Sequence, residues 1–458
     1  MDAPLKNIVS VAETLAEKAG AVTPQSIPAA VRTRVEELLI DATGLCFAAR
    51  QSDYMRALLG SVDAGGPCTA IGHQATYNAQ TAALINGTAI HGEDFDDTFE
   101  GGPVHSSAPI LPAVLAACER FERDGPAALA GIAVGVEALC RLSLVVPKAV
   151  HKSGFHPTSV LGAVAAALAV SKVLGLNRVQ TTYALGNAGS FASGIIEYLA
   201  DGAWIKRVHP GWAAQAGLQA ARLGSQDFLG PRTVFEGVHG LFNGFARSKA
   251  GNFAALTDGF GEQWLMEGIT FKPYATGTMN QPYIDCALRL AKRGIRLEDI
   301  RDVLCETADG YVDRLWEPLA SKHRPPNAYI AKFSAPFNIA VAFVTGSAGL
   351  GAFTDQTVRD ERILALASKV RYVVNPNDPY PKAYTGHVRI TLNDGRTVEE
   401  RQSHIRGGAD EPLTRAEIET KFSGNCDFGC WPRARSDTFL RSVPGFFDRK
   451  IDLAALRE

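Results

Sequence analysis

The segment His91-Gly-Glu-Asp-Phe-Asp-Asp-Thr98, with His105 shortly after it, is the most informative part of this sequence. If the segment is helical or forms a tight turn, Asp94 shares one face with Asp97 and Thr98, which follow it three and four residues later. Carboxylates crowded in this way cannot all ionise at low cost, so at least one should have a raised pKa. A carboxylate in that state can take a proton from carbon.

Two other interpretations of the acidic segment exist. A calcium loop requires Gly at its sixth position and Glu at its twelfth, and this sequence has neither. A solvated acidic turn is the common alternative for such a cluster. Spacing alone therefore leaves a catalytic cluster and a solvated turn equally open.

Two histidines follow breaks in the sequence and precede apolar helical segments. His105 comes after Gly101-Gly-Pro103, and His156 lies in Gly154-Phe-His-Pro-Thr-Ser159. A helix N-terminus favours anions, and a histidine there can act as an acid, a base or a carboxylate ligand near neutral pH. Taken singly, each is more often an ordinary residue at the start of a helix.

Basic side chains occur in two notable surroundings. Lys206-Arg207 lies between Trp204 and His209 in an apolar neighbourhood, and Lys272 lies in Phe271-Lys-Pro-Tyr274 at a predicted domain junction. Clefts between domains are preferred ligand sites. A lysine there could hold a substrate carboxylate, or stabilise the anion formed when a proton leaves the neighbouring carbon. For each of them a plain surface role is the alternative.

Composition and missing motifs exclude several classes of protein. The chain has 458 residues, 46% hydrophobic and 21% charged, with a net charge of −2, so it gives no electrostatic case for nucleic acid or an anionic membrane. No glycine-rich nucleotide fingerprint follows a predicted strand, and no cysteine trio suits an iron–sulfur cluster. Neither His-Glu-x-x-His nor Gly-x-Ser-x-Gly occurs. An acid/base enzyme without metal or cofactor is the class that remains.

The cysteines and the apolar stretches indicate a cytoplasmic protein. Most of the eight cysteines lie in apolar runs, and no secreted disulfide framework or zinc pattern is present. Residues 1–6 show no signal-peptide pattern. The apolar run 160–170 is too short for a bilayer, which needs about 20 residues, and is better explained as a buried helix of small side chains.

The order of the predicted elements divides the chain in two. Apolar spacing predicts helices in the first part, separated by Gly and Pro breaks such as His209-Pro-Gly211. Strands are predicted at 303–307, 370–374, 387–392 and 397–403, the last two joined by a hairpin turn at Asn393-Asp-Gly395. The predicted fold is mainly α, with a large all-helical domain of residues 1–268 and 405–458 and a smaller α+β domain of residues 269–404.

Six segments in this order resemble the MmgE/PrpD family, whose members include 2-methylcitrate dehydratase, cis-aconitate decarboxylase and iminodisuccinate epimerase. These segments are 87–108, 154–159, 205–214, 271–274, 331–336 and 408–422. No single segment is decisive, but six in register are specific. The resemblance implies a helical domain with an α+β lid domain and a cleft between them, a homodimer, a small di- or tricarboxylate substrate, and no metal or cofactor.

The resemblance also implies the residues of the active site. The implied catalytic residues are Asp94, Thr98, His105, His156, Lys206 and Lys272. The implied substrate-binding residues are His156, Lys206, Arg207, Lys272 and Tyr274. In this hypothesis Asp94 or His105 is the base, and Thr98 orients a neighbour by a hydrogen bond.

The sequence departs from the family pattern at three places. Phe337 stands where the family often has Tyr, and residues 275–281 replace a Pro-x-Cys and His pattern. One extra residue separates Thr98 from His105. The missing hydroxyl at position 337 argues weakly against a dehydratase or decarboxylase that uses it, and favours epimerisation.

The leading functional hypothesis is a lyase of the 2-methylcitrate dehydratase type, which removes an α-proton from a hydroxy-polycarboxylate and then eliminates water. An epimerase would return the proton to the opposite face, and a decarboxylase would lose CO₂ and protonate the resulting carbanion. A further alternative is a non-catalytic, carboxylate-binding member of the family. Such a member would be expected to lack one of the acid/base residues, and all of them are present here.

Overall fold

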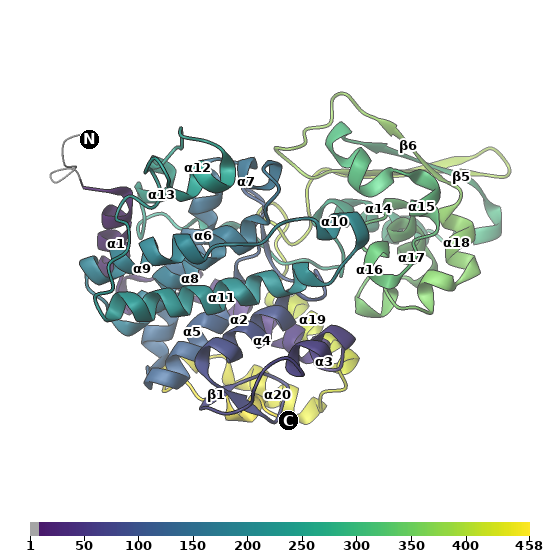
Figure 1. Cartoon of the computed structure of the whole chain (residues 1–458). Coiled ribbons are helices and arrows are strands. Elements are labelled where there is room, and N and C mark those ends of the chain that lie inside the picture. The colour runs from purple at the N-terminus through teal and green to yellow at the C-terminus, as the bar shows by residue number, and fades with distance from the viewer. Residues whose placement is uncertain (1–8) are drawn as a thin grey trace. The chain divides into compact units, whose positions relative to one another are not determined.

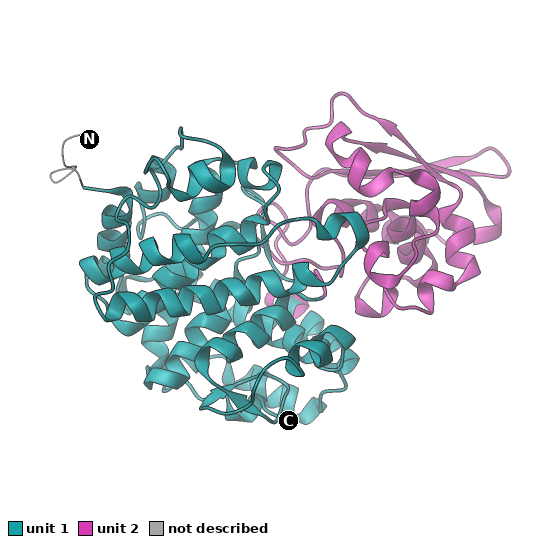
Figure 2. Cartoon of the chain, viewed as in Figure 1, with its two compact units in different colours: residues 1–92, 96–269, 418–458 teal, residues 93–95, 270–417 magenta. Residues whose placement is uncertain are grey.

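The structure is a computed structural model that describes residues 9–458. The described residues form two compact units (Figure 2). Unit 1 contains the described residues up to Gly92, together with Asp96–Ile269 and Ile418–Glu458, and unit 2 contains Glu93–Phe95 and Thr270–Glu417. The predicted return to the first domain at residue 405 differs from the observed return at Ile418. The inclusion of Glu93–Phe95 in unit 2 has no counterpart in the prediction.

Unit 1 is built mainly from helices (Figure 1). Its helices are α1 (Val11–Ala21), α2 (Ala29–Ala49), α3 (Asp53–Leu59), α4 (Ala79–His91), α5 (Ser107–Phe121), α6 (Gly125–Val145), α7 (Ala149–Lys152), α8 (Pro157–Leu174), α9 (Arg178–Phe191), α10 (Tyr198–Asp201), α11 (Ile205–Ser225), α12 (Leu241–Ala246), α13 (Ala254–Thr257), most of α19 (Arg415–Phe428) and α20 (Arg433–Ser442). The mainly α fold class is confirmed.

Unit 1 also contains short strands of two residues each beside its helices. Strands β1 (Cys68–Thr69) and β2 (Thr76–Tyr77) form an antiparallel pair, and β3 (Thr98–Phe99) follows the acidic segment. The turn between β1 and β2 contains Gly72 at φ 83°, a left-handed conformation that glycine adopts most easily. This turn lets the chain between α3 and α4 fold back on itself.

Small side chains let the central helices of unit 1 pack closely, as the Ala- and Gly-rich segments predict. Helix α11 packs against α8, α4 and α9. A Cβ atom added to Gly217 on α11 would lie 2.5 Å from the Cβ of Ala166 on α8, so only glycine fits there. The predicted helix break at His209-Pro-Gly211 is wrong, because α11 runs through it. Gly211 instead allows the close approach of α4, since its Cβ would lie 2.2 Å from the carbonyl oxygen of Leu84.

Helices α6 and α8 are long and apolar enough to cross a membrane by length and composition, and Ala335–Thr345 with Leu350–Arg359 passes the same test as one bent pair. The apolar run 160–170 lies within α8, which has 18 residues. The most apolar windows of α6 and α8 are 94% and 89% buried inside the described structure. Their apolar surfaces thus face other protein elements, as expected for a buried helix. The cytoplasmic location stays a prediction, and the stretch 1–6 lies outside the described residues.

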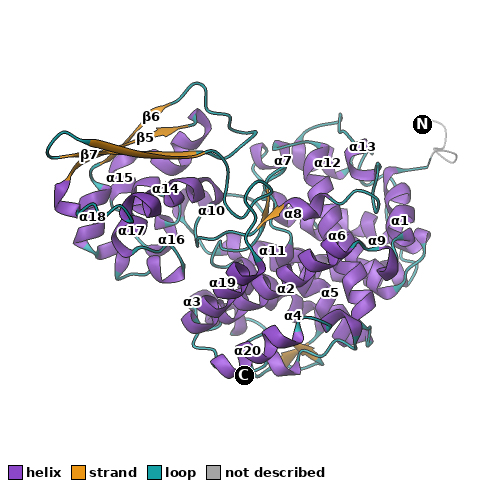
Figure 3. Cartoon of the chain, turned by 180° about the vertical axis from the view of Figure 1, so that it is seen from behind, coloured by secondary structure: helices purple, strands orange, loops and turns teal. Residues whose placement is uncertain are grey.

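Unit 2 is an α+β unit with a four-stranded sheet (Figure 3). Its strands are β5 (Ile300–Thr307), β6 (Val370–Val374), β7 (Gly386–Leu392) and β8 (Thr397–Gln402), and its helices are α14 (Gln281–Ala291), α15 (Leu319–His323), α16 (Ala328–Ala331), α17 (Ala335–Thr345) and α18 (Glu361–Ala367). The order is β6-β5-β7-β8, with β5 and β6 parallel and the other neighbours antiparallel. The predicted strands and the hairpin are confirmed, although β5 begins three residues earlier than predicted. The short strand β4 (Ile269–Thr270) lies where the chain passes from unit 1 to unit 2.

Candidate active site

The acidic segment forms a turn rather than a helix. Helix α4 ends at His91, and strand β3 begins at Thr98. Asp94 between them has φ 55°, a left-handed conformation that is uncommon for a residue other than glycine and is enriched at functional sites. The helical arrangement of Asp94, Asp97 and Thr98 is therefore wrong, and specific contacts hold the turn instead.

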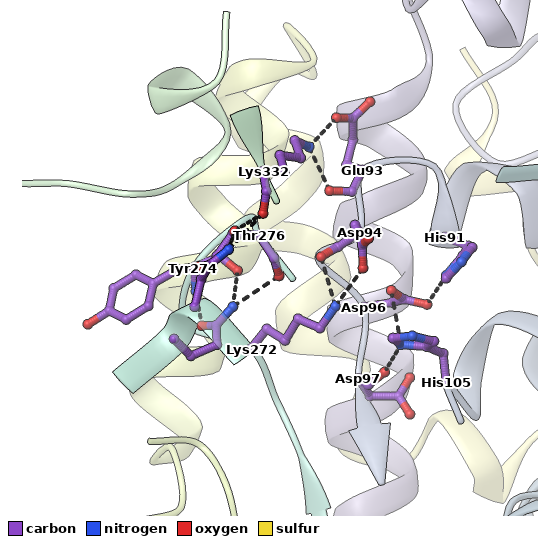
Figure 4. Close-up of polar contacts among 12 residues, drawn as sticks. His91, Glu93, Asp94, Asp96, Asp97, His105, Lys272, Tyr274, Thr276 and Lys332 are labelled. Atoms are coloured by element: carbon purple, nitrogen blue, oxygen red, sulfur yellow. Dashed lines mark hydrogen bonds and ion pairs between the residues drawn. The ribbon is translucent and has the colours of Figure 1, made fainter. Parts of the chain in front are cut away.

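Within unit 2, two buried lysines hold the segment Glu93–Phe95, which we call the acidic strap (Figure 4). Lys272 Nζ lies 2.8 Å from Asp94 Oδ1 and 2.9 Å from the Asp94 carbonyl oxygen. Lys332 Nζ lies 2.7 Å from Glu93 Oε2 and 2.6 Å from the Glu93 carbonyl oxygen. Each lysine thus binds both a carboxylate and the backbone of the strap. The predicted pair of Asp94 and Lys272 is in contact, whereas Lys332 was not among the predicted site residues.

Tyr274 does not join Asp94 and Lys272. Its hydroxyl donates a hydrogen bond of 2.6 Å to Asp285 Oδ1, and its ring points away from Lys272 in Figure 4. Burial, followed by the nearby Asp285 carboxylate, raises the pKa of Tyr274, and burial raises the pKa of Asp285 to about 6. The role of Tyr274 in substrate binding stays a prediction, and the structure gives its hydroxyl a different partner.

Within unit 1, His105 is oriented by a backbone carbonyl and a carboxylate (Figure 4). Its Nδ1 lies 2.7 Å from the carbonyl oxygen of Asp97 and 3.6 Å from Asp96 Oδ1. A carbonyl oxygen can only accept, so Nδ1 carries the proton. In the neutral ring, Nε2 is then the basic nitrogen. The other oxygen of Asp96 lies 2.7 Å from His91 Nδ1, so Asp96 links two imidazoles.

The carboxyl group with the expected raised pKa is Asp97, but its contacts are structural. Burial raises the pKa of Asp97 most, and Asp96 raises it further, while hydrogen bonds from two serines oppose the shift. Those hydrogen bonds come from the backbone N–H groups of Ser106 and Ser107, at 2.9 and 3.0 Å, and from both hydroxyls. Asp97 therefore holds the start of α5, where a negative charge is favourable.

Four buried histidines lie in contact in unit 1, and we call them the histidine cluster: His91, His105, His156 and His209. The ring centroids of His91 lie 4.8 Å from His105 and 5.5 Å from His156, and those of His156 and His209 lie 5.3 Å apart. Burial, followed by the positive charges nearby, holds the pKa of His156 well below its usual range and lowers that of His209 to about 4. Both rings are therefore neutral near pH 7. His91 and His209 were not predicted as site residues. Each lies in a sequence segment close to residues that were predicted, and this was the only indication of their role.

The remaining predicted residues of unit 1 take different places. Lys206 lies in the first turn of α11 and is one of the charges that lower the pKa of His156 and His209, so it belongs with the histidine cluster. The guanidinium of Arg207 lies 4.2 Å from the centre of the Tyr54 ring, a cation–π contact. Thr98 is buried in β3.

Three of these residues also have the composition of a metal site. Ligand atoms of His91, Asp96 and His105 all lie within 4.8 Å of one another. The hydrogen bonds of Asp96 and of the Asp97 carbonyl account for the orientation of both rings without an ion. The prediction of a metal-free protein remains a prediction.

A cavity in unit 1 lies away from the predicted site residues. Its volume is about 900 Å³, and α20 and the C-terminal residues form most of its lining. None of the predicted site residues lines it. The histidine cluster is therefore identified by its chemistry and its contacts rather than by cavity size.

These features define a class: a mainly α protein of two units, with a buried cluster of histidines in one and buried lysines paired with carboxylates in the other. Comparison with known families identifies it further. Residues 13–254 match the MmgE/PrpD N-terminal domain and residues 274–438 match the MmgE/PrpD C-terminal domain. The chain belongs to the MmgE/PrpD family, which confirms the resemblance drawn from the sequence.

Several relatives in this family carry the name of one activity. The chain is 28% identical over 423 residues to the cis-aconitate decarboxylase-like protein oryM of Aspergillus oryzae, covering 87% of each chain. It is 27% identical over 427 residues to cis-aconitate decarboxylase of Aspergillus terreus, covering 86% of this chain and 85% of the relative. It is 27% identical over 362 residues to the human cis-aconitate decarboxylase, covering 75% and 72%.

Proposed function

We propose that this protein is a lyase that moves a proton at a carbon atom of a small polycarboxylate, with decarboxylation as its reaction and His105 as the proton-transfer group. The orientation of His105 carries the proposal. Its Nδ1 proton is held by the Asp97 carbonyl oxygen, so Nε2 can accept or return a proton. In this proposal the proton transfer is carried out by protein side chains alone.

His105 is a better acid/base group than Asp94. Asp94 is paired with the buried ammonium of Lys272, which favours its ionised form and lowers its basicity. His105 instead lies beside the Asp96 carboxylate, which stabilises the positive charge that the ring gains when it binds a proton. Of the two candidate bases, we therefore assign the proton transfer to His105.

The histidine cluster and Lys206 suit a carboxylate substrate. Carboxylate oxygens accept hydrogen bonds and are stabilised by an ammonium group, which Lys206 supplies. His156 caps the start of α8, a position that favours anions. In the proposed reaction the bond to one carboxylate breaks and CO₂ leaves. The electron pair remains on the substrate, and the protonated His105 ring delivers its proton to that carbon.

The named relatives support decarboxylation over dehydration, which the sequence hypothesis placed first. The argument for epimerisation from Phe337 stays a prediction. Phe337 is fully buried in the core of unit 2, and its ring centroid lies 6.3 Å from that of Phe353.

The deciding experiment is incubation in D₂O with cis-aconitate, 2-methylcitrate, citrate and iminodisuccinate, followed by NMR of the products. We expect loss of CO₂ and incorporation of one deuterium at carbon from a tricarboxylate. Loss of water would replace decarboxylation by the dehydratase alternative, and exchange without net product would indicate an epimerase. Neither exchange nor product with any substrate would contradict the proposal and favour a carboxylate-binding protein.

The proposal includes two further expectations from the family resemblance. The protein forms a homodimer, which light scattering coupled to gel filtration tests directly. It binds neither nucleic acid nor membranes, in agreement with a net charge of −2. A monomer at micromolar concentration would contradict the first expectation without affecting the assignment of His105.

A further inference from the structure

His156 and His209 face each other through the same ring nitrogen. Their Nδ1 atoms are 3.2 Å apart, which is hydrogen-bond distance. We infer that His209 is a positioning residue that fixes the tautomer of His156, so that His156 presents an N–H group at Nε2. The contact between the two rings comes from the structure, and the choice of this tautomer rests on the proposed function.

The backbone holds both rings in place from independent elements. The backbone N–H of His156 donates a hydrogen bond of 2.8 Å to the carbonyl oxygen of Gly194, and the Ser159 hydroxyl donates one of 3.3 Å to the carbonyl oxygen of His209. Gly194 has φ 115°, and a Cβ there would lie 2.7 Å from Ser159 Oγ and 3.4 Å from His209 Cε1. The segment before α10 therefore passes close to the His209 ring and is hydrogen-bonded to the backbone of His156.

The contact between the two Nδ1 atoms couples the protonation of the rings. One proton fits between them, because two would clash and none would place two lone pairs in contact. If His209 donates, the proton of neutral His156 is on Nε2. If His156 donates, its Nε2 is a lone pair instead. The two arrangements give His156 opposite chemical roles.

The surroundings favour a neutral pair, and the proposed substrate requires His209 to be the donor. Lys206 on α11, His91 at the end of α4 and His105 before α5 act on His156 electrostatically, and Tyr198 on α10 packs against both rings. The positive charge of Lys206 disfavours a second charge on the pair. A carboxylate or an enolate oxygen only accepts hydrogen bonds, so a substrate of this class requires the Nε2–H form of His156.

Three substitutions separate the tautomers. His209→Asn keeps a donor close to the position of Nδ1, His209→Asp places an acceptor there, and His209→Leu removes the hydrogen bond. The tautomer of His156 is determined by two-dimensional ¹⁵N–¹H correlation spectra of the full chain labelled at histidine, without substrate. His239→Asn, at an exposed position of unit 1, is the matched control.

We expect His156 to carry its proton on Nε2 in the wild-type protein and in His209→Asn. The proton should move to Nδ1 in His209→Asp, and both forms should be present in His209→Leu. Turnover should follow the tautomer: kcat falls at least about tenfold in His209→Asp and stays within about threefold in His209→Asn, the range found for partners that orient catalytic histidines. His239→Asn should change neither.

The spectra test the positioning role of His209, and the kinetics test the proposed function. A wild-type His156 with its proton on Nδ1, or an unchanged tautomer in His209→Asp, would overturn the inference whatever the enzyme does. If the tautomer changes as expected and no polycarboxylate is turned over, the proposed function fails and the positioning role of His209 stands. If His209→Asp does not fold, the wild-type and His209→Asn spectra still decide the tautomer.

Discussion

The histidine cluster of unit 1 and the acidic strap of unit 2 differ in whether their side chains carry a charge. The carboxylates of the strap are charged, and an oxygen of each lies within 2.8 Å of a lysine Nζ atom. The histidine cluster contains groups whose charge is suppressed: burial and Lys206 keep His156 and His209 neutral. Charges that are compensated in pairs hold a backbone shape, here the left-handed turn at Asp94. A neutral imidazole can instead donate a hydrogen bond from one ring nitrogen and accept one at the other.

This difference gives each region its own response to substitution. Loss of one partner in the strap leaves a buried charge without compensation, so the main effect should be on folding. Loss of a ring in the histidine cluster removes a group that transfers or directs a proton, so the main effect should be on turnover. Each of the following predictions tests one side of that contrast.

The largest effect is expected for Lys272→Met, which removes the lysine that binds Asp94 of the strap. This change removes the ammonium group that lies 2.8 Å from the buried Asp94 carboxylate, and we expect it to lower the free energy of unfolding by about 3–5 kcal/mol in urea denaturation. The double variant Lys272→Met/Asp94→Asn should recover a large part of the loss, because the carboxylate charge is then removed together with the ammonium. A loss below about 1 kcal/mol, the range of exposed ion pairs, would show that the pair is solvated.

The pH dependence of stability should reveal the suppressed charge of His209. Its pKa is lowered from 6.5 to about 4 in the folded state, so between these values the unfolded chain binds more protons. The stabilisation is fully present above pH 6.5 and is lost as the pH falls through about 4, by about 3 kcal/mol in total. His209→Asn lacks this contribution, so its stability relative to wild type should rise by that amount between pH 7 and pH 4. Parallel stability curves for the two proteins would show that His209 has an ordinary pKa.

For the histidine cluster, His105→Asn should lower kcat at least about a hundredfold, the usual size of an acid/base contribution. The amide can still donate to the Asp97 carbonyl oxygen, so the change in urea stability should stay below about 1 kcal/mol. This variant thus pairs low activity with near-normal folding, the reverse of Lys272→Met. Near-normal kcat would remove His105 from the mechanism.

The smallest effect is expected for Tyr274→Phe. The substitution removes the hydrogen bond to Asp285 and should lower the free energy of unfolding by about 1 kcal/mol. Because the hydroxyl is directed to Asp285 rather than to Lys272, kcat and KM should each change less than about twofold, within the range of a residue outside the transition-state contacts. A tenfold rise in KM would restore Tyr274 as a substrate-binding residue.

Regular patterns in the sequence were sufficient for most of the fold. The strand at 387–392 and the turn at Asn393-Asp-Gly395 depend on neighbouring residues only, and the structure has β7 and β8 there. The helix break expected at His209-Pro-Gly211 was wrong because packing against α4 decides that position. The short β1–β2 pair was missed because strands of two residues have no detectable period.

Residue types and their order along the chain were enough to identify the family, the mainly α fold and the side chains of the site: a dense acidic segment, histidines before helices, and lysines in apolar surroundings. Which of these side chains contact each other is known only from the folded structure. It gave Asp94 to Lys272 and Glu93 to Lys332, turned Tyr274 to Asp285, and placed His209 against His156. The physical reason is that hydrogen bonds and ion pairs act over a few ångströms between atoms far apart in the chain. The proton position on each histidine depends on such a contact, which no spacing in the sequence records.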